Sequence, residues 1–359
     1  MRNIKKLNKL NIVYIIFFWN VLFINIIFLT SLKANSFKIT NLEISEPFEL
    51  NFNKDRVIDK GFKEAFIELI SMTTTTEDKK KIQSTPLSTI KGLVDSFTMS
   101  NERFINNEYF VNFDVNFNKK NTLNFFEKKN IFPSIPEKKK LLIIPVIVDL
   151  EIDKIFLFTN NIFYKNWNKI DKSYFLINYF LPSEDLEDVN LLLQNSKSIE
   201  EYNFKKMIQK YDVKDFIITI IYKDENELKI LSKIKLKETY RIDNKKFQNI
   251  DLNKKEDFDK VLDELKNTYE NYWKNINQIN TSIKLPLTIS LSSKENIKIK
   301  ILENNLKEMD LVSNFEISKF NNERIYYKIT YNGPPNKFLS DMFEKGIKID
   351  TQNQLWEVE

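Results

Sequence analysis

The sequence contains no histidine and no cysteine, and only four of its 359 residues are glycine. Without the first two, the chain cannot form a catalytic triad with a histidine base, a zinc site of Cys/His type, a disulfide or a c-type haem attachment. The glycines stand far apart, so neither GxxxxGK[ST] nor GxGxxG occurs. Asp, Glu, Lys and Tyr are the remaining candidates for acid or base chemistry, and we expect no cofactor and no metal.

The formal charge of +5 is unevenly distributed. Arg2, Lys5, Lys6, Lys9 and Lys33 lie in the first 34 residues, which contain no acid, and removing them from the 55 basic residues leaves as many bases as the 50 acids. Binding to nucleic acid depends on clustered basic residues, which the remainder lacks. We therefore expect no nucleic-acid partner.

Residues 1–34 are predicted to be a signal peptide or a membrane anchor. A basic start precedes an apolar run from Ile12 to Thr30, and Ala34 follows as a small residue suited to cleavage. A secretory core usually has about 7 to 15 residues and a spanning helix about 20, so the length fits both. The sequence thus predicts a periplasmic protein, or one with a single inner-membrane span over residues 12–30 and its body on the periplasmic side.

Residues 35–138 are predicted to form a first α+β domain. A helix from Asn53 or Asp55 to about Ser71 has apolar residues at helical spacing, and two alternating strands around Asn106 and Asn107 predict a hairpin. A strand before that helix and a short helix over Thr122–Lys129 complete it. We expect the stretch TTTTEDKKKIQSTP, which begins at Thr73, to be an exposed loop.

The run LLIIPVIVDL, Leu141–Leu150, is short, apolar and bounded by charge, which predicts a strand buried on both faces. It begins a middle domain, residues 139–282, with further strands near residues 155–158, 174–181, 215–222 and 228–236. Phe258–Ile279 is the longest helical pattern, and its aromatic stripe is typical of a core.

Residues 283–359 have the predicted order βαββαβ, with a hairpin turning at Asn321 and Asn322. This order predicts a ferredoxin-like sandwich. The fold class expected for the whole chain is α+β, with two or more small split βαβ sandwiches after the N-terminal hydrophobic segment.

The chain resembles the proteobacterial envelope proteins that carry the "domain of unknown function 2066". The similar segments are RVIDKGFKEAFIELIS, YFVNFDVNF, LLIIPVIV, residues 161–167, and the C-terminal stretch from Tyr331 to Val358. Thr73–Thr76 stand where the family usually has a glycine, and Ile162 and Phe163 replace a Pro-Trp pair. The resemblance implies an α+β fold and an envelope location, and it implies no mechanism.

Three functions follow as hypotheses. The first is a non-catalytic envelope protein that binds or assembles unidentified envelope proteins. The second is a hydrolase of cell-wall glycans that uses two carboxylates, with Asp114, Asp185 and Asp188 as candidates, although the acids of LPSEDLED fit a capped helix start better. The third is a carrier of lipids or small ligands that uses the aromatic side chains around Phe163 and Trp167.

Overall fold

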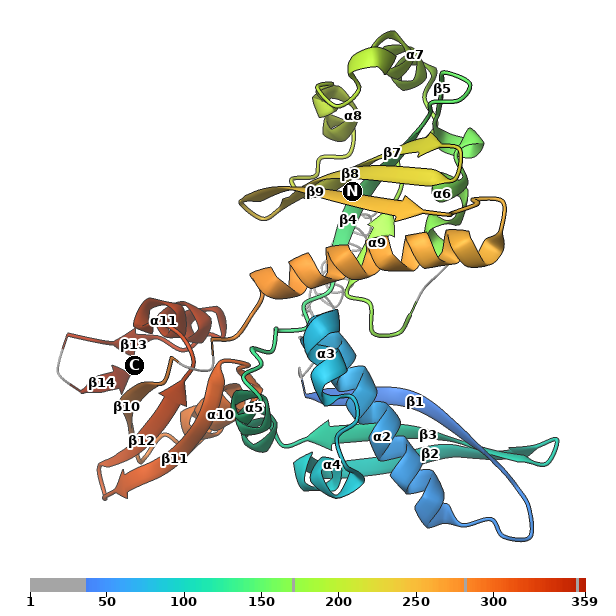
Figure 1. Cartoon of the computed structure of the whole chain (residues 1–359). Coiled ribbons are helices and arrows are strands. Elements are labelled where there is room, and N and C mark those ends of the chain that lie inside the picture. The colour runs from blue at the N-terminus through green and yellow to red at the C-terminus, as the bar shows by residue number, and fades with distance from the viewer. Residues whose placement is uncertain (1–36, 170–171, 281–282, 353–354) are drawn as a thin grey trace, which may run out of the picture. The chain divides into compact units, whose positions relative to one another are not determined.

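The computed structural model describes residues 37–169, 172–280, 283–352 and 355–359. It is a mixed α+β structure with three separate β-sheets (Figure 1), so the expected class is confirmed. Within these residues, no helix has the length and apolar character needed to cross a membrane. The predicted N-terminal signal or anchor lies outside the described residues.

The first sheet has three antiparallel strands in the order β1-β3-β2. The long helix α2 packs against it, and its apolar residues form one core cluster with those of β3. Alternate residues of β3 are buried, as expected for a strand with one covered face. The elements are β1 (Lys38–Pro47), α2 (Lys54–Thr73), α3 (Thr76–Ile82), α4 (Leu87–Leu93), β2 (Val94–Ile105), β3 (Glu108–Phe117) and α5 (Lys119–Lys128).

Local signals account for the confirmed elements of this region. The Asn53 side chain accepts a hydrogen bond from Asp55 N and caps α2. Gly61 lies on the buried face of α2, where a Cβ would approach the Phe113 ring to 3.0 Å, so glycine permits the close packing of helix on sheet. Asn106 and Asn107 both have positive φ, as the tight turn of the β2–β3 hairpin requires.

The prediction of an exposed loop from Thr73 onward is wrong in part, because residues 76–82 form helix α3. The Thr75 side chain accepts from Asp78 N, two acids lie in the first turn and three lysines lie in the last. This arrangement complements the helix dipole, so capping and charge form a helix that apolar periodicity did not indicate.

The central sheet has the order β5-β4-β7-β8-β9, with β6 also paired to β4. The strand β4 is parallel to β6 and β7, and it is buried on both faces, as predicted. Its odd-numbered residues pack in the cluster under helix α9, and its even-numbered residues pack against α7 and α8. The elements are β4 (Lys139–Asp149), β5 (Lys154–Phe156), α6 (Ile162–Asn166), β6 (Ile177–Phe180), α7 (Leu186–Gln194), α8 (Lys205–Gln209), β7 (Phe216–Asp224), β8 (Glu227–Leu236), β9 (Thr239–Gln248) and α9 (Lys255–Ile276).

The C-terminal sheet has the order β11-β12-β10-β14-β13. The single last strand of the predicted order βαββαβ is instead two short strands, β13 and β14, and β14 runs parallel to β10. Residues of α10 and α11 join the core cluster of this sheet. The elements are β10 (Leu285–Ser292), α10 (Asn296–Glu308), β11 (Val312–Phe320), β12 (Arg324–Tyr331), α11 (Pro335–Glu344), β13 (Ile349–Asp350) and β14 (Trp356–Val358).

Candidate interaction surface

Apolar side chains are exposed together where the β2–β3 hairpin turns and where β1 leads into α2. Phe104 is 59% exposed, Phe48 is 48% exposed and Leu50 is fully exposed. The ring centroids of Phe48 and Phe104 are 4.8 Å apart. We call this group the aromatic tip; its exposed members are Phe48, Leu50 and Phe104, and the partly buried Phe52 and the buried Tyr109 contact its rings.

Backbone and polar contacts hold the two segments of the aromatic tip together. Phe48 N donates to the Asn107 carbonyl at 2.7 Å, which joins the segment after β1 to the hairpin turn. Tyr109 donates its hydroxyl proton to Glu102 at 2.8 Å, and Lys54 bonds the same carboxylate. Burial and Glu102 raise the pKa of Tyr109 to about 12, so its hydroxyl remains a donor at neutral pH. The aromatic tip is therefore ordered by its own contacts while its apolar surface faces solvent.

Acidic and basic residues both lie around the aromatic tip. Glu102 pairs with Lys54, Glu46 with Lys60 and Glu43 with Arg103. No ion pair involves Glu49 or Glu108 within the described part of the chain. An exposed apolar patch with a polar rim is typical of a surface that binds another molecule.

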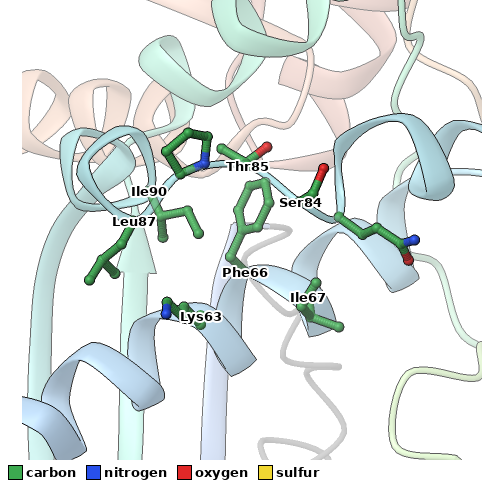
Figure 2. A pocket seen from close by; sticks show the side chains of 9 residues that line it. Lys63, Phe66, Ile67, Ser84, Thr85, Leu87 and Ile90 are labelled. Carbon is green, nitrogen blue, oxygen red and sulfur yellow. The ribbon is translucent and has the colours of Figure 1, made fainter.

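A shallow cleft lies further along α2, between that helix and the segment that joins α3 to α4 (Figure 2). Its volume is about 450 Å³. Phe66 and Ile90 form its buried floor, and Lys63, Gln83 and Ser84 lie at its exposed rim. Phe66 points toward Thr85 in Figure 2, and the polar side chains at the rim do not converge on one point. The cleft therefore lacks the polar cluster that orients a substrate.

The structure distributes the three candidate carboxylates over two sheets. Asp114 lies in β3, and its side chain accepts from Asn41 N at 2.9 Å, where β1 has a bulge and Asn41 has positive φ. Asp185 and Asp188 lie at the start of α7, beside the central sheet. Asp114 is therefore bonded to the β1 backbone and lies in a different sheet from the region of Asp185 and Asp188.

Asp185 and Asp188 both bind one lysine. Lys210 Nζ donates to Asp185 at 2.6 Å and to the buried Asp188 at 2.8 Å. Asp185 also caps α7 by accepting from Glu187 N. Lys210 lowers the pKa of Asp185, whereas a general acid needs a raised pKa. These contacts are those of a capped and cross-linked helix start.

Phe163 and Trp167 are completely buried in the central core. The Trp167 ring stacks on Tyr269 of α9 at 6.3 Å between centroids and meets Tyr179 edge-on at 5.6 Å. Phe163 packs on Phe258. As placed, neither side chain offers surface to a ligand.

Three charged residues of α9 are also buried, namely Lys266, Glu270 and Lys274. Glu270 accepts from Leu176 N and Ile177 N at 3.0 and 2.8 Å and so holds the start of β6. Burial raises the pKa of Glu270 and lowers that of Lys274 to about 8. Lys274 donates to the Ser71 carbonyl in the last turn of α2, where a cation complements the helix dipole. Glu270 and Lys274, whose pKa values are shifted, therefore both bind backbone groups of neighbouring segments.

Within the ranges given above, no cluster of three Asp or Glu residues is arranged to hold a metal ion. Sequence reasoning missed the aromatic tip, although a signal was present. Phe48, Leu50 and Phe52 recur at a spacing of two beside Pro47 and Asn53, and Phe104 and Ile105 directly precede the Asn-Asn turn. Large apolar residues in turn-forming segments indicate exposure.

The chain matches no protein-family model and no curated protein. The resemblance drawn from its segments therefore stays a prediction.

Proposed function

We propose that this chain is a non-catalytic binding protein of the bacterial cell envelope, exported or tethered by its N-terminal segment, that docks on another envelope protein through the aromatic tip. The observation that carries the proposal is the exposed cluster of Phe48, Leu50 and Phe104. Aromatic side chains lose little conformational entropy on binding and are frequent among the residues that contribute most to interfaces.

The charges around the aromatic tip favour a protein partner over a lipid surface. Peripheral attachment to bilayers usually combines apolar side chains with Lys or Arg, which attract anionic headgroups. Here Lys54, Lys60 and Arg103 are paired with Glu102, Glu46 and Glu43, whereas Glu49 and Glu108 have no ion pair among the described residues. An apolar protein surface with a basic rim complements this pattern.

The polar side chains also support a binding role. The Asp185, Asp188 and Lys210 cluster and the buried residues of α9 are occupied by contacts that hold secondary structure. Because these ionisable groups already have structural contacts, they do not indicate a catalytic site, and the exposed apolar side chains of the aromatic tip indicate a binding surface instead.

We further propose that the C-terminal unit is a variant of the ferredoxin-like sandwich. The order β11-β12-β10-β14 and the two helices that share its core support this assignment. The parallel pairing of β14 with β10 is the variation.

The test is cross-linking of the full chain in cells. The double variant Phe48→Ser, Phe104→Ser removes the two most extended rings of the aromatic tip. The control is Phe320→Ser, because Phe320 is 65% exposed on β11, far along the chain from the tip. We expect wild type and control to give the same cross-linked envelope protein and the double variant to lose it.

Unchanged cross-links in the double variant would overturn the proposal, as would equal loss in the control. Flotation of the purified protein with anionic vesicles separates the lipid alternative. Co-flotation that requires Phe48 and Phe104 would replace the protein partner by a membrane.

A further inference from the structure

The two outer strands of the N-terminal sheet differ in how their free edges are protected. β1 carries Lys38, Glu43 and Glu46, ends at Pro47 and has a bulge in its first half. β2 has one register shift between Val94 and Ser96 and another between Ser100 and Arg103, and the regular stretch between them, Ser96–Ser100, contains no charge and no proline. Charges, prolines and bulges are the usual means of preventing edge pairing, so the middle of β2 is the unprotected edge.

The register identifies which backbone groups of β2 face away from the sheet. Phe117 N donates to Phe37 O at the β1 side, and Asn118 N donates to Leu93 O at the β2 side. Because directions alternate along a strand and β3 is regular, Asn116, Asp114 and Asn112 direct their backbone groups to Ser96, Thr98 and Ser100. Phe97 and Met99 therefore point their N–H and C=O groups outward from the sheet.

The outward stretch is complementary to itself. If a second copy lies antiparallel with Thr98 opposite Thr98, then Phe97 of each copy faces Met99 of the other, and Ser96 faces Ser100. Phe97 and Met99 have the outward backbone groups, so they make the hydrogen-bonded pairs, while the two Thr98 residues form a non-hydrogen-bonded pair. Phe with Met and Thr with Thr are favourable neighbours across strands.

Side chains on both faces suit this pairing. Phe97 is 39% exposed, and its ring meets Phe62 of α2 at 5.0 Å, so the apolar pairs extend the face that α2 covers. Ser96, Thr98 and Ser100 lie on the opposite, polar face. No charged residue lies within the stretch, so no like charges meet.

We propose that two copies of this chain associate through β2, with the twofold axis at Thr98, to form one continuous six-stranded sheet. The proposal stands on the edge of β2 and is independent of the aromatic tip. The pairing involves a short stretch of each copy, so the association is weak and depends on concentration, as is usual for interfaces below roughly 1,200 Å².

The lack of cysteine allows a direct test. Cα atoms of a non-hydrogen-bonded antiparallel pair are about 4.5 Å apart, which suits a disulfide. Thr98→Cys in the full chain is therefore expected to cross-link in cells under a mild oxidant and to give a band of twice the chain mass on a non-reducing gel. Ser96→Cys is the matched control, because the two Ser96 residues are offset by roughly 14 Å along the strands.

Three outcomes decide the proposal. We expect strong dimer formation for Thr98→Cys, none for Ser96→Cys alone, and a restored dimer when Ser96→Cys and Ser100→Cys chains are expressed together. Equal dimer formation by Thr98→Cys and Ser96→Cys would indicate random collision and overturn the proposal. A Thr98→Cys cross-link only to a chain of another size would overturn it in favour of a foreign strand.

A second pair of variants tests the backbone hydrogen bonds. Met99→Pro removes an outward N–H and leaves the bonds to β3, whereas Met99→Ala keeps that N–H. Added to Thr98→Cys, Met99→Pro is expected to abolish the dimer band and Met99→Ala to retain it. Thermal unfolding of both confirms that each is folded. A dimer that persists with Met99→Pro would contradict pairing through this edge.

Discussion

Two groups of contacting aromatic rings in the described part of the chain differ in how far they are covered. In the central core, the Trp167 ring contacts Tyr179 and Tyr269, and all three side chains are buried in the cluster that includes α9. At the aromatic tip, the Phe104 ring contacts Phe48 and Tyr109; Phe48 and Phe104 are exposed, and only Tyr109 is buried. No helix among the described residues covers the tip as α9 covers the core.

The difference shows that aromatic density does not identify a binding surface. The same ring contacts stabilise a core when a helix excludes water from them, and leave an exposed apolar surface when none does. The stretch from Phe163 to Trp167 is more aromatic in sequence than the aromatic tip. Its position beneath α9 decides its role.

The sharpest way to test this contrast is to truncate one ring from each group. Trp167→Ala is expected to lower the free energy of unfolding by about 3–5 kcal/mol, because it leaves a cavity in a packed core. Phe104→Ala, at a side chain that is 59% exposed, is expected to cost less than about 1 kcal/mol. Urea unfolding of both variants measures the difference, and equal costs would show that the aromatic tip is also a core.

The next largest effect is a pH dependence of stability that comes from Lys274 of α9, the helix that covers the central aromatic core. Burial lowers the pKa of Lys274 from 10.5 to about 8, with Glu270 and Lys79 as its charged neighbours. Between about pH 8 and 10.5, the unfolded chain keeps a proton that the folded chain has released, so the free energy of unfolding from this group rises with pH. The rise is at most about 3 kcal/mol.

Urea unfolding at several pH values measures this rise. Burial also lowers the pKa values of Lys119 and Lys79, so the rise in the wild type is a sum of several groups. Lys274→Met is expected to reduce it, and an unchanged pH profile would contradict the assignment to Lys274.

The smallest expected difference comes from the same substitution at one tyrosine of each group. The Tyr269 hydroxyl is bonded to Thr219 at 2.9 Å and Ser232 at 2.7 Å, all three buried. Tyr269→Phe removes the hydrogen bonds to both hydroxyls and is expected to lower the free energy of unfolding by about 1–3 kcal/mol. Tyr109→Phe leaves Glu102 bound to Lys54 and exposed to solvent, and we expect less than about 1 kcal/mol. Thermal unfolding compares the two, and a larger cost for Tyr109→Phe would reverse the comparison.

Much of the fold follows from local signals in the sequence. Asn53, one of the two caps considered, caps α2, and the acids of LPSEDLED mark a capped helix start, with Asp185 as the cap. Asn106 and Asn107 form the predicted turn, and β4 is buried on both faces. Each of these depends on residues close together in the chain. Predictions of this kind succeed because the physical cause is equally local.

The rest depends on packing between distant segments. The sequence of β9 is mostly polar, and it becomes a strand because it pairs along its whole length with β8. The aromatic tip exists because the segment after β1 bonds to the turn of a hairpin far along the chain. Sequence patterns show that Phe48 and Phe104 are apolar, and only the fold brings them together and leaves them uncovered.

The parallel pairing of β4 with β7 also has a kinetic consequence. Leu142 pairs with Phe216, and the residues between them include α6, α7 and α8. During synthesis, the edge of β4 that pairs with β7 stays unpaired until β7 has been synthesised, whereas the two strands of the β2–β3 hairpin are adjacent in sequence and can pair at once. Three lysines lie directly before the apolar run, at residues 138–140. Their positive charges repel the same segment of neighbouring chains and so oppose aggregation while β4 is unpaired.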